Sequence, residues 1–325
     1  MSDVAREAGV SPMSVSNAFK RPDIVLPATR ERILAVARRL GYVPNRIAGT
    51  LASGRSHVVA AIVPSIRNSS FARTIQGLGD YLTEHGYELL LAVADTPERE
   101  RRAIEAVLGR RPEGIVLTGN EHPPETLALL AGVETPVVET WILGDPIIDM
   151  AVGFSLADAG YAIGTFLTGR GYRHIGFAGY APASQRRFLE RQGGFQSALR
   201  EAGLRDDLLF YAEEAAGFAG GRAAVTELLQ REPRLDALFC VTDIFAAGAL
   251  FECQRRGLSV PGQLAIAGFG DFEIAAEIVP ALTTVRTRGY EIGQAAGRLL
   301  LDRAAGGPPG GRVNVGFELV SREST

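Results

Sequence analysis

The chain has 325 residues, of which 46% are hydrophobic and 22% are charged, and its formal net charge at pH 7 is −3. This length favours two or three domains over one, and the composition is that of a soluble globular protein. No apolar run approaches the roughly 18 residues that cross a membrane, and the first ten residues lack the apolar core of a secretory signal. We therefore expect a cytoplasmic protein with no membrane partner.

The charge is unevenly distributed along the chain. Residues 1–57 carry a balance of +5, whereas the rest of the chain carries −8. A basic segment joined to an acidic body is typical of a protein that meets a polyanion at one end. Chance clustering on a solvated surface gives the same balance, so the charge alone leaves both interpretations open.

The cysteines and histidines show no pattern of a metal or redox site. Cys240 and Cys253 lie in apolar surroundings without CxxC spacing, which favours reduced core thiols. No two histidines stand at ligand spacing, so we expect no metal site and no cofactor. The histidines are His57, His85, His122 and His174.

The N-terminal 44 residues are predicted to form three short helices. The first covers 3–8, the second begins with Ser11 as its N-cap and Pro12 at its first position, and the third covers 28–40. Two helices joined by a tight glycine-containing turn, with a third packed on them, are typical of a helix-turn-helix unit. The expected core consists of Val4, Ala5, Val10, Val15, Ala18, Ile33 and Leu40.

A fourth short helix follows, with Asn45 as a candidate N-cap, and it ends at Gly54. A free helix of about ten residues is marginal in water, because its nucleation cost is not recovered. Another element must therefore hold it.

From residue 58 the chain changes to short apolar runs separated by helical stretches. Runs such as "HVVAAIVPS" and "PEGIVLTG" are continuous in hydrophobicity, which indicates strands of a buried parallel sheet. A second series runs from "HIGFAGY" to "QLAIAGFGD". Two such units would leave a cleft at the carboxyl ends of their strands. Helices are expected at 72–85, 97–109, 156–170, 190–202, 219–231 and 244–256.

Four stretches carry a likeness to a known family: "DVAREAGVSPMSVSNAF", "TRERILAVARRLGYVPNRIAGTLASGRS", "ALTTV" and "LVSREST". Together they resemble the LacI/GalR family of bacterial transcriptional repressors over essentially the whole chain. Within that family, "AVGF", "FECQRRGL" and "AIAGF" are similar to the gluconate-utilisation repressors.

The resemblance implies an all-α helix-turn-helix head and a periplasmic-binding-protein-like α/β core of two doubly wound parallel-sheet subdomains. It also implies a homodimer on double-stranded operator DNA. The expected bounds are 1–44 for the head, 45–57 for a hinge helix and linker, and 58–325 for the effector-binding and dimerisation core. Within the core, the first subdomain would comprise about 58–155 and 284–313, and the second about 156–283 and 314–325.

The resemblance further implies which residues meet DNA. The second helix of the head would enter the major groove, with serines on phosphates and with Met13 and Asn17 as base readers. Two hinge helices would pack over the minor groove, where Leu51 is either the wedge that kinks the duplex or an ordinary packing leucine. The DNA-facing residues are Ser11, Pro12, Met13, Ser14, Ser16, Asn17, Asn45, Arg46, Ala48 and Leu51.

Position 17 departs from the family, in which it is commonly arginine. Arginine reads guanine, whereas asparagine pairs best with adenine. We therefore expect an operator altered at one half-site position, unless Asn17 is only a solvent-facing residue.

Family positions also place an effector at the strand ends. Aromatic rings would cover C–H faces, while arginine and aspartate would bond a carboxylate and hydroxyls. Solvated arginines, and a helix-capping role for Asp243, are the alternatives. The effector-facing residues are Asn68, Phe71, Trp141, Phe154, Arg187, Arg191, Thr242, Asp243 and Asp271.

Two features favour an acidic effector, gluconate or a related sugar acid. Arg186 and Arg187 closely precede Arg191. Gly270 stands where many sugar-binding relatives have aspartate, so a neutral sugar loses one hydroxyl acceptor. We expect the effector to release the operator, with a neutral sugar or a corepressor as the alternative.

A periplasmic sugar-binding protein and an enzyme are the competing classes. The basic head and the missing signal disfavour the first. Against the second, no nucleophile elbow, P-loop or metal cluster is present, and "GFGDFE" has Glu273 in place of the third glycine of GxGxxG. We therefore expect a regulator and not an enzyme.

Overall fold

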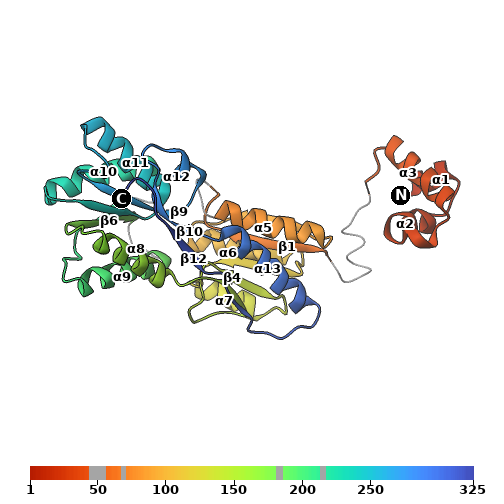
Figure 1. Cartoon of the computed structure of the whole chain (residues 1–325). Helices are drawn as coiled ribbons and strands as arrows, with labels where there is room; N and C mark the ends of the chain where they lie inside the picture. The colour runs from red at the N-terminus through yellow and green to blue at the C-terminus, as the bar shows by residue number, and fades with distance from the viewer. Residues whose placement is uncertain (44–55, 67–70, 181–185, 213–216) are drawn as a thin grey trace. The chain divides into compact units, whose positions relative to one another are not determined.

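The computed structural model describes residues 1–43, 56–66, 71–180, 186–212 and 217–325, which form two compact units, Met1–Ser56 and His57–Thr325 (Figure 1). The predicted hinge residues Asn45, Arg46, Ala48 and Leu51 and the predicted effector residue Asn68 lie outside this part of the chain. None of the described helices is long and apolar enough to cross a membrane.

The first unit is the predicted three-helix head. Its second helix is capped as expected, because the Ser11 hydroxyl accepts a hydrogen bond from the Ser14 amide at 3.0 Å and Pro12 occupies the first turn. The helices are α1 (Ser2–Ala8), α2 (Pro12–Lys20), the 3-10 turn η1 (Pro22–Ile24) and α3 (Pro27–Arg39).

The core of the head confirms five of the predicted residues as buried: Val4, Ala5, Val15, Ala18 and Ile33. Val10 packs on this core while partly exposed. The prediction for Leu40 is wrong, because α3 ends at Arg39 and Leu40 lies past its last turn with 40% of its surface exposed. Ala8, Val36 and Ala37 complete the buried core instead.

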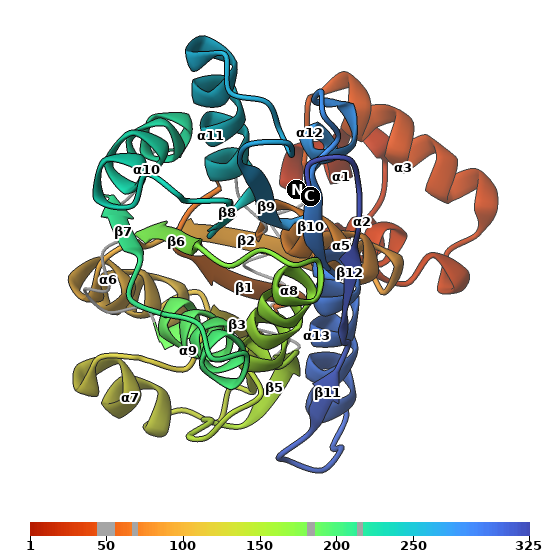
Figure 2. The same ribbon diagram turned by 60° about the vertical axis from the view of Figure 1, so that its left-hand side comes forward.

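The second unit contains two six-stranded sheets, each flanked by helices (Figure 2). The first lobe has the strand order β11-β5-β4-β3-β1-β2, all parallel, and the second has β12-β10-β9-β8-β6-β7, parallel except for β12. This is the predicted α/β architecture of two doubly wound subdomains.

The elements of the first lobe are β1 (Val58–Val63), α5 (Phe71–Glu84), β2 (Glu88–Val93), α6 (Pro97–Leu108), β3 (Gly114–Thr118), α7 (Pro124–Ala131), β4 (Val137–Thr140), β5 (Met150–Gly153), α13 (Gly289–Ala304) and β11 (Arg312–Asn314). The elements of the second lobe are α8 (Leu156–Gly169), β6 (Ile175–Tyr180), α9 (Arg186–Glu201), β7 (Leu209–Ala212), α10 (Gly217–Arg231), β8 (Ala237–Cys240), α11 (Asp243–Arg256), β9 (Ala265–Gly270), α12 (Glu273–Glu277), β10 (Thr283–Thr287) and β12 (Phe317–Val320).

The chain returns to the first lobe later than the sequence suggested. The predicted boundary at residue 284 falls inside β10, which pairs with β9 and β12 in the second sheet. Pairing with two neighbours holds the whole strand in the second lobe, so the crossing follows Thr287. Both cysteines are buried thiols within this lobe.

Helices α8 and α9 touch backbone to backbone, and only glycine permits that contact. A Cβ on Gly160 would lie 1.9 Å from the Arg191 carbonyl oxygen, and one on Gly194 would lie 1.9 Å from the Ala157 carbonyl oxygen. Both distances are far below van der Waals contact. The glycines therefore fix the position of α9 against the second lobe.

This packing predicts opposite effects of two neighbouring substitutions. Gly194→Ala should lower the free energy of unfolding by about 1–3 kcal/mol or more, because the new methyl group overlaps α8. Gly193→Ala is the matched control, since a Cβ there meets nothing within 4 Å. It should raise the free energy of unfolding by about 0.4–1 kcal/mol, through a less flexible unfolded chain. Urea unfolding followed by circular dichroism distinguishes the two, and equal effects would contradict the contact.

Candidate functional site

A row of aromatic rings crosses from the first lobe to the second at the carboxyl ends of the strands. Phe71, the first residue of α5, meets Trp141 edge to face with 5.5 Å between ring centroids. Trp141 meets Phe154 at 5.9 Å, and Phe154 stacks on Phe269 of β9 at 6.4 Å. The structure thus brings together three predicted residues, Phe71, Trp141 and Phe154, and adds Phe269.

Trp141 is held rigidly in this row. Its backbone adopts a left-handed conformation with φ of 68°, and its indole Nε1 donates a hydrogen bond to the Thr74 hydroxyl at 3.1 Å. Gly153 lets the following backbone approach, since a Cβ there would lie 2.5 Å from the Ile142 amide nitrogen. The ring is therefore positioned before any ligand arrives.

Arg191 is a buried cation beside the aromatic row. Its surface is 6% exposed, its guanidinium carbon lies 3.5 Å from the Phe269 ring centroid, and its Nη1 donates to the Val241 carbonyl oxygen at 2.5 Å. Its Nε has no acceptor among the described residues, and none of their carboxylates forms an ion pair with it.

The surroundings of Arg191 disfavour its charged form. Burial, helped by the neighbouring Arg187 cation, lowers the pKa of Arg191 from 12.5 to about 9. The group remains charged at neutral pH, so it is a cation in a place that favours an anion. Arg187 itself reaches the first lobe, where its guanidinium carbon lies 5.0 Å from the Phe71 ring centroid.

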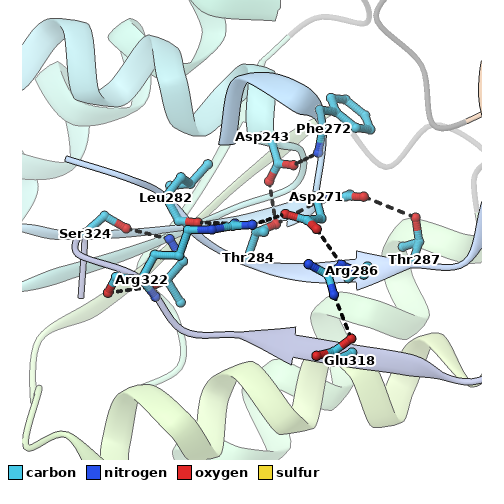
Figure 3. A network of polar contacts seen from close by, with 12 residues as sticks. Asp243, Asp271, Phe272, Leu282, Thr284, Arg286, Thr287, Glu318, Arg322 and Ser324 are labelled. Atoms are coloured by element: carbon cyan, nitrogen blue, oxygen red, sulfur yellow. Dashed lines mark hydrogen bonds and ion pairs between the residues drawn. The ribbon is translucent and has the colours of Figure 1, made fainter. Parts of the chain in front are cut away.

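Of the two predicted residues after β8, Asp243 belongs to a network of polar contacts (Figure 3), whereas Thr242 caps a helix. Thr242 is the N-cap of α11 and accepts from the Phe245 amide, so Asp243 is not the cap. The Asp243 carboxylate is buried and accepts from the Thr284 hydroxyl at 2.5 Å and the Phe272 amide at 2.7 Å. Burial raises the pKa of Asp243 to about 6 although both donors oppose the shift.

Asp271 lies between two arginines (Figure 3). Its Oδ2 accepts from Arg286 Nε at 2.6 Å and its Oδ1 from Arg322 Nη2 at 2.7 Å, while Glu318 bonds the other side of Arg286. Burial would raise the pKa of Asp271, but the two guanidinium groups lower it below its usual value. Both oxygens of this carboxylate therefore already have partners within the protein.

In the head, α2 places the predicted DNA-facing residues on its outer side. Ser11, Pro12 and Met13 are exposed, and Met13 shows 70% of its surface to solvent. Ser14, Ser16 and Asn17 are partly exposed, in contrast to the two buried residues of the helix.

Both units of the chain match models of known protein families. Residues 1–45 match bacterial regulatory proteins of the lacI family, and residues 165–325 match a periplasmic binding protein-like domain. The HTH-type transcriptional regulator GntR of Pseudomonas aeruginosa is 35% identical over 328 residues, covering 100% of this chain and 95% of that protein.

The chain belongs to the LacI family. A LacI-family transcriptional regulator from Silicibacter pomeroyi has a TM-score of 0.90 at 32% identity, with 99% of this chain and 98% of that chain covered. The lac repressor dimer bound to operator has the same fold, with a TM-score of 0.86 at 22% identity over 99% of this chain and 98% of that chain. The chain is thus a transcriptional regulator of the LacI family, like the relatives it resembles.

The sequence did not indicate the partners of His122, whose side chain is buried in the loop after β3. Its side chain is 1% exposed, with Nδ1 3.0 Å from Glu100 Oε1 and Nε2 3.2 Å from Glu139 Oε1. Burial would lower the pKa of His122, but the two carboxylates outweigh it and raise the pKa from 6.5 to about 9. At neutral pH the imidazolium therefore links α6, β4 and the loop after β3.

This shift predicts that stability depends on pH. Because the folded pKa of His122 exceeds 6.5, its contribution is complete below pH 6.5 and is lost as the pH rises through about 9. As the imidazolium loses its proton over that interval, the free energy of unfolding should fall by about 3 kcal/mol. His122→Gln should be less stable at pH 6.5 and should lack this fall in urea titrations. His85→Gln, at an exposed histidine, should retain it, and an equal pH dependence of the two variants would contradict the assignment.

Proposed function

We propose that this LacI-family protein is a dimeric repressor that binds a palindromic operator and is released by a sugar acid, gluconate or a close relative. The observation that carries the proposal is Arg191, a buried cation beside Arg187 with no carboxylate partner among the described residues. The repressor would act in the cytoplasm.

A buried guanidinium without a counter-charge is unfavourable, because desolvation of the ion is not offset. A carboxylate of the effector would offset it through charge-assisted hydrogen bonds, including one to the unbonded Nε. The neighbouring rings of Phe71 and Trp141 would supply apolar surface for the C–H groups of a carbon chain. The cleft thus combines an anion-binding end with an aromatic wall.

The carboxylates near the cleft favour an acid over a neutral sugar. A neutral sugar is recognised mainly through acceptors for its hydroxyl donors. Asp243 and Asp271 already accept hydrogen bonds from protein groups through both of their oxygens. Two of the roughly four acceptor sites of each carboxylate are therefore already used, which leaves fewer acceptors for the hydroxyl groups of a neutral sugar.

Release of the operator follows from linkage between the two sites. An effector shifts the equilibrium only by its different affinities for the operator-bound and free states. The hinge residues through which the two units would communicate, 45–57 in the sequence prediction, fall largely outside the described part of the chain.

Calorimetric titration of the repressor with sodium gluconate tests the effector. Gluconate should bind, and Arg191→Ala should weaken binding about 30-fold or more, because removing one member of a buried charge pair costs at least about 2 kcal/mol. Arg200→Ala, which removes an exposed arginine from the same helix, is the control and should bind normally. Tight binding of glucose with no response to gluconate would contradict the sugar-acid assignment.

Operator recognition is tested at position 17. If Asn17 reads a base, Asn17→Arg should change the preferred base pair at one half-site position from A·T to G·C, by about 1–3 kcal/mol of discrimination. Fluorescence anisotropy at constant salt, with duplexes selected from a random pool, measures this preference. Lys20→Ala, at the exposed end of the same helix, should change affinity for all sequences alike. An unchanged preference would assign Asn17 to the solvent-facing role.

A further inference from the structure

The start of α9 is bonded to the opposite lobe at two points. The amide N–H of Arg186 donates to Glu121 Oε2 at 2.8 Å, and the Arg186 Nη1 donates to the Asp145 carbonyl oxygen at 2.9 Å. Glu121 follows β3 and Asp145 follows β4, both in the first lobe, whereas α9 belongs to the second. These bonds join the two lobes at the start of the helix that carries Arg191.

The two contacts are suited to holding a helix end. A carboxylate at the first amide of a helix is favoured by the helix dipole and satisfies a donor that has no partner inside the helix. The Arg186 side chain is also fixed from its own helix, since its Nε donates to Glu190 Oε1 at 2.7 Å. This bond fixes the side-chain conformation in which the guanidinium points at the first lobe.

The first-lobe side of this contact is braced by further hydrogen bonds. Asn120 Nδ2 donates to the carbonyl oxygens of Gly144 and Pro146, both at 2.9 Å, and so ties the loop after β3 to the loop after β4. Arg312 Nη1 donates to the Leu143 carbonyl oxygen at 2.8 Å. His122, next to Glu121, is the imidazolium held between two carboxylates. The loops that carry Glu121 and Asp145 are therefore held in place by hydrogen bonds within the first lobe.

We infer that Arg186 is a positioning residue that keeps the effector cleft closed through Glu121 and Asp145. Arg186 contacts none of the rings in the aromatic row and lies over one helical turn before Arg191 on the same helix. It acts by holding α9 against the first lobe, so that Arg187 and Arg191 face the aromatic row. Its influence on the effector rests on the proposed function, whereas its influence on closure does not.

Closure can be measured without any effector, because the chain contains a single tryptophan and that residue lies in the aromatic row that links the two lobes. Trp141 is 4% exposed in the closed arrangement. Acrylamide quenching of its fluorescence should be weak in the wild type. In the double variant Glu121→Ala/Arg186→Ala, the quenching constant should rise about two- to threefold. An unchanged constant in a double variant that unfolds normally in urea would overturn the inference.

The matched control is Arg200→Ala. Arg200 lies on α9 and bonds Asp206 and Ser197 within the second lobe, so its loss removes an arginine without touching the first lobe. Its quenching constant should equal that of the wild type. A rise as large as that of the double variant would show a general loosening of α9, and would overturn the specific role of Arg186.

Effector kinetics give the second measurement, with sodium gluconate as the probe and Trp141 fluorescence as the signal. The double variant should release gluconate roughly three- to tenfold faster, the effect of losing one or two partly exposed hydrogen bonds, with an unchanged association rate. Glu121→Gln, which keeps an acceptor, should fall between the double variant and the wild type. A fall in association rate alone would contradict closure. If gluconate does not bind the wild type while quenching still rises in the double variant, the closure role stands and the effector assignment fails.

Discussion

The backbone contact between α8 and α9 is the constraint on which the arrangement of the cleft depends. Gly160 and Gly194 bring the two helices closer than any other residue would allow. Every arginine of the candidate effector site lies on α9, so its position relative to the second sheet is set by this contact. The hydrogen bonds from Arg186 then relate the same helix to the first lobe.

Charge in this region is divided between two neighbouring groups of residues. Asp271 is neutralised by Arg286 and Arg322, which tie β9, β10 and the C-terminal segment together. Arg191 has no such partner among the described residues, although it lies close to that network through Val241 and Phe269. Asp271 is thus satisfied within the protein, whereas Arg191 is the charged group that an anionic ligand would stabilise most.

Local features of the sequence predicted much of the fold. The Ser11 cap, the proline after it and the continuous apolar strands are short-range signals, and the structure confirms each of them. Leu40 was misassigned because periodicity does not show where a helix ends. The boundary at 284 was misplaced because pairing of β10 with two strands depends on contacts far along the chain.

The candidate site was predictable only in part. The resemblance pointed to the aromatic residues and to Arg191, which the structure brings together. It did not indicate the partners of Glu121, His122 or Asp271, because each of these pairs residues from separate elements. Phe269 ends a strand of ordinary apolar composition, and nothing in that composition distinguishes a ring that stacks under a guanidinium from one that fills a core.

The division of the cleft between the lobes has a consequence for how its specificity can evolve. The aromatic wall comes mainly from the first lobe, whereas the arginines come from one helix of the second. A few substitutions on that helix would change the charge of the accepted ligand while the wall and the sheets stay intact. A regulator built in this way would be retuned from one class of ligand to another without rebuilding its core.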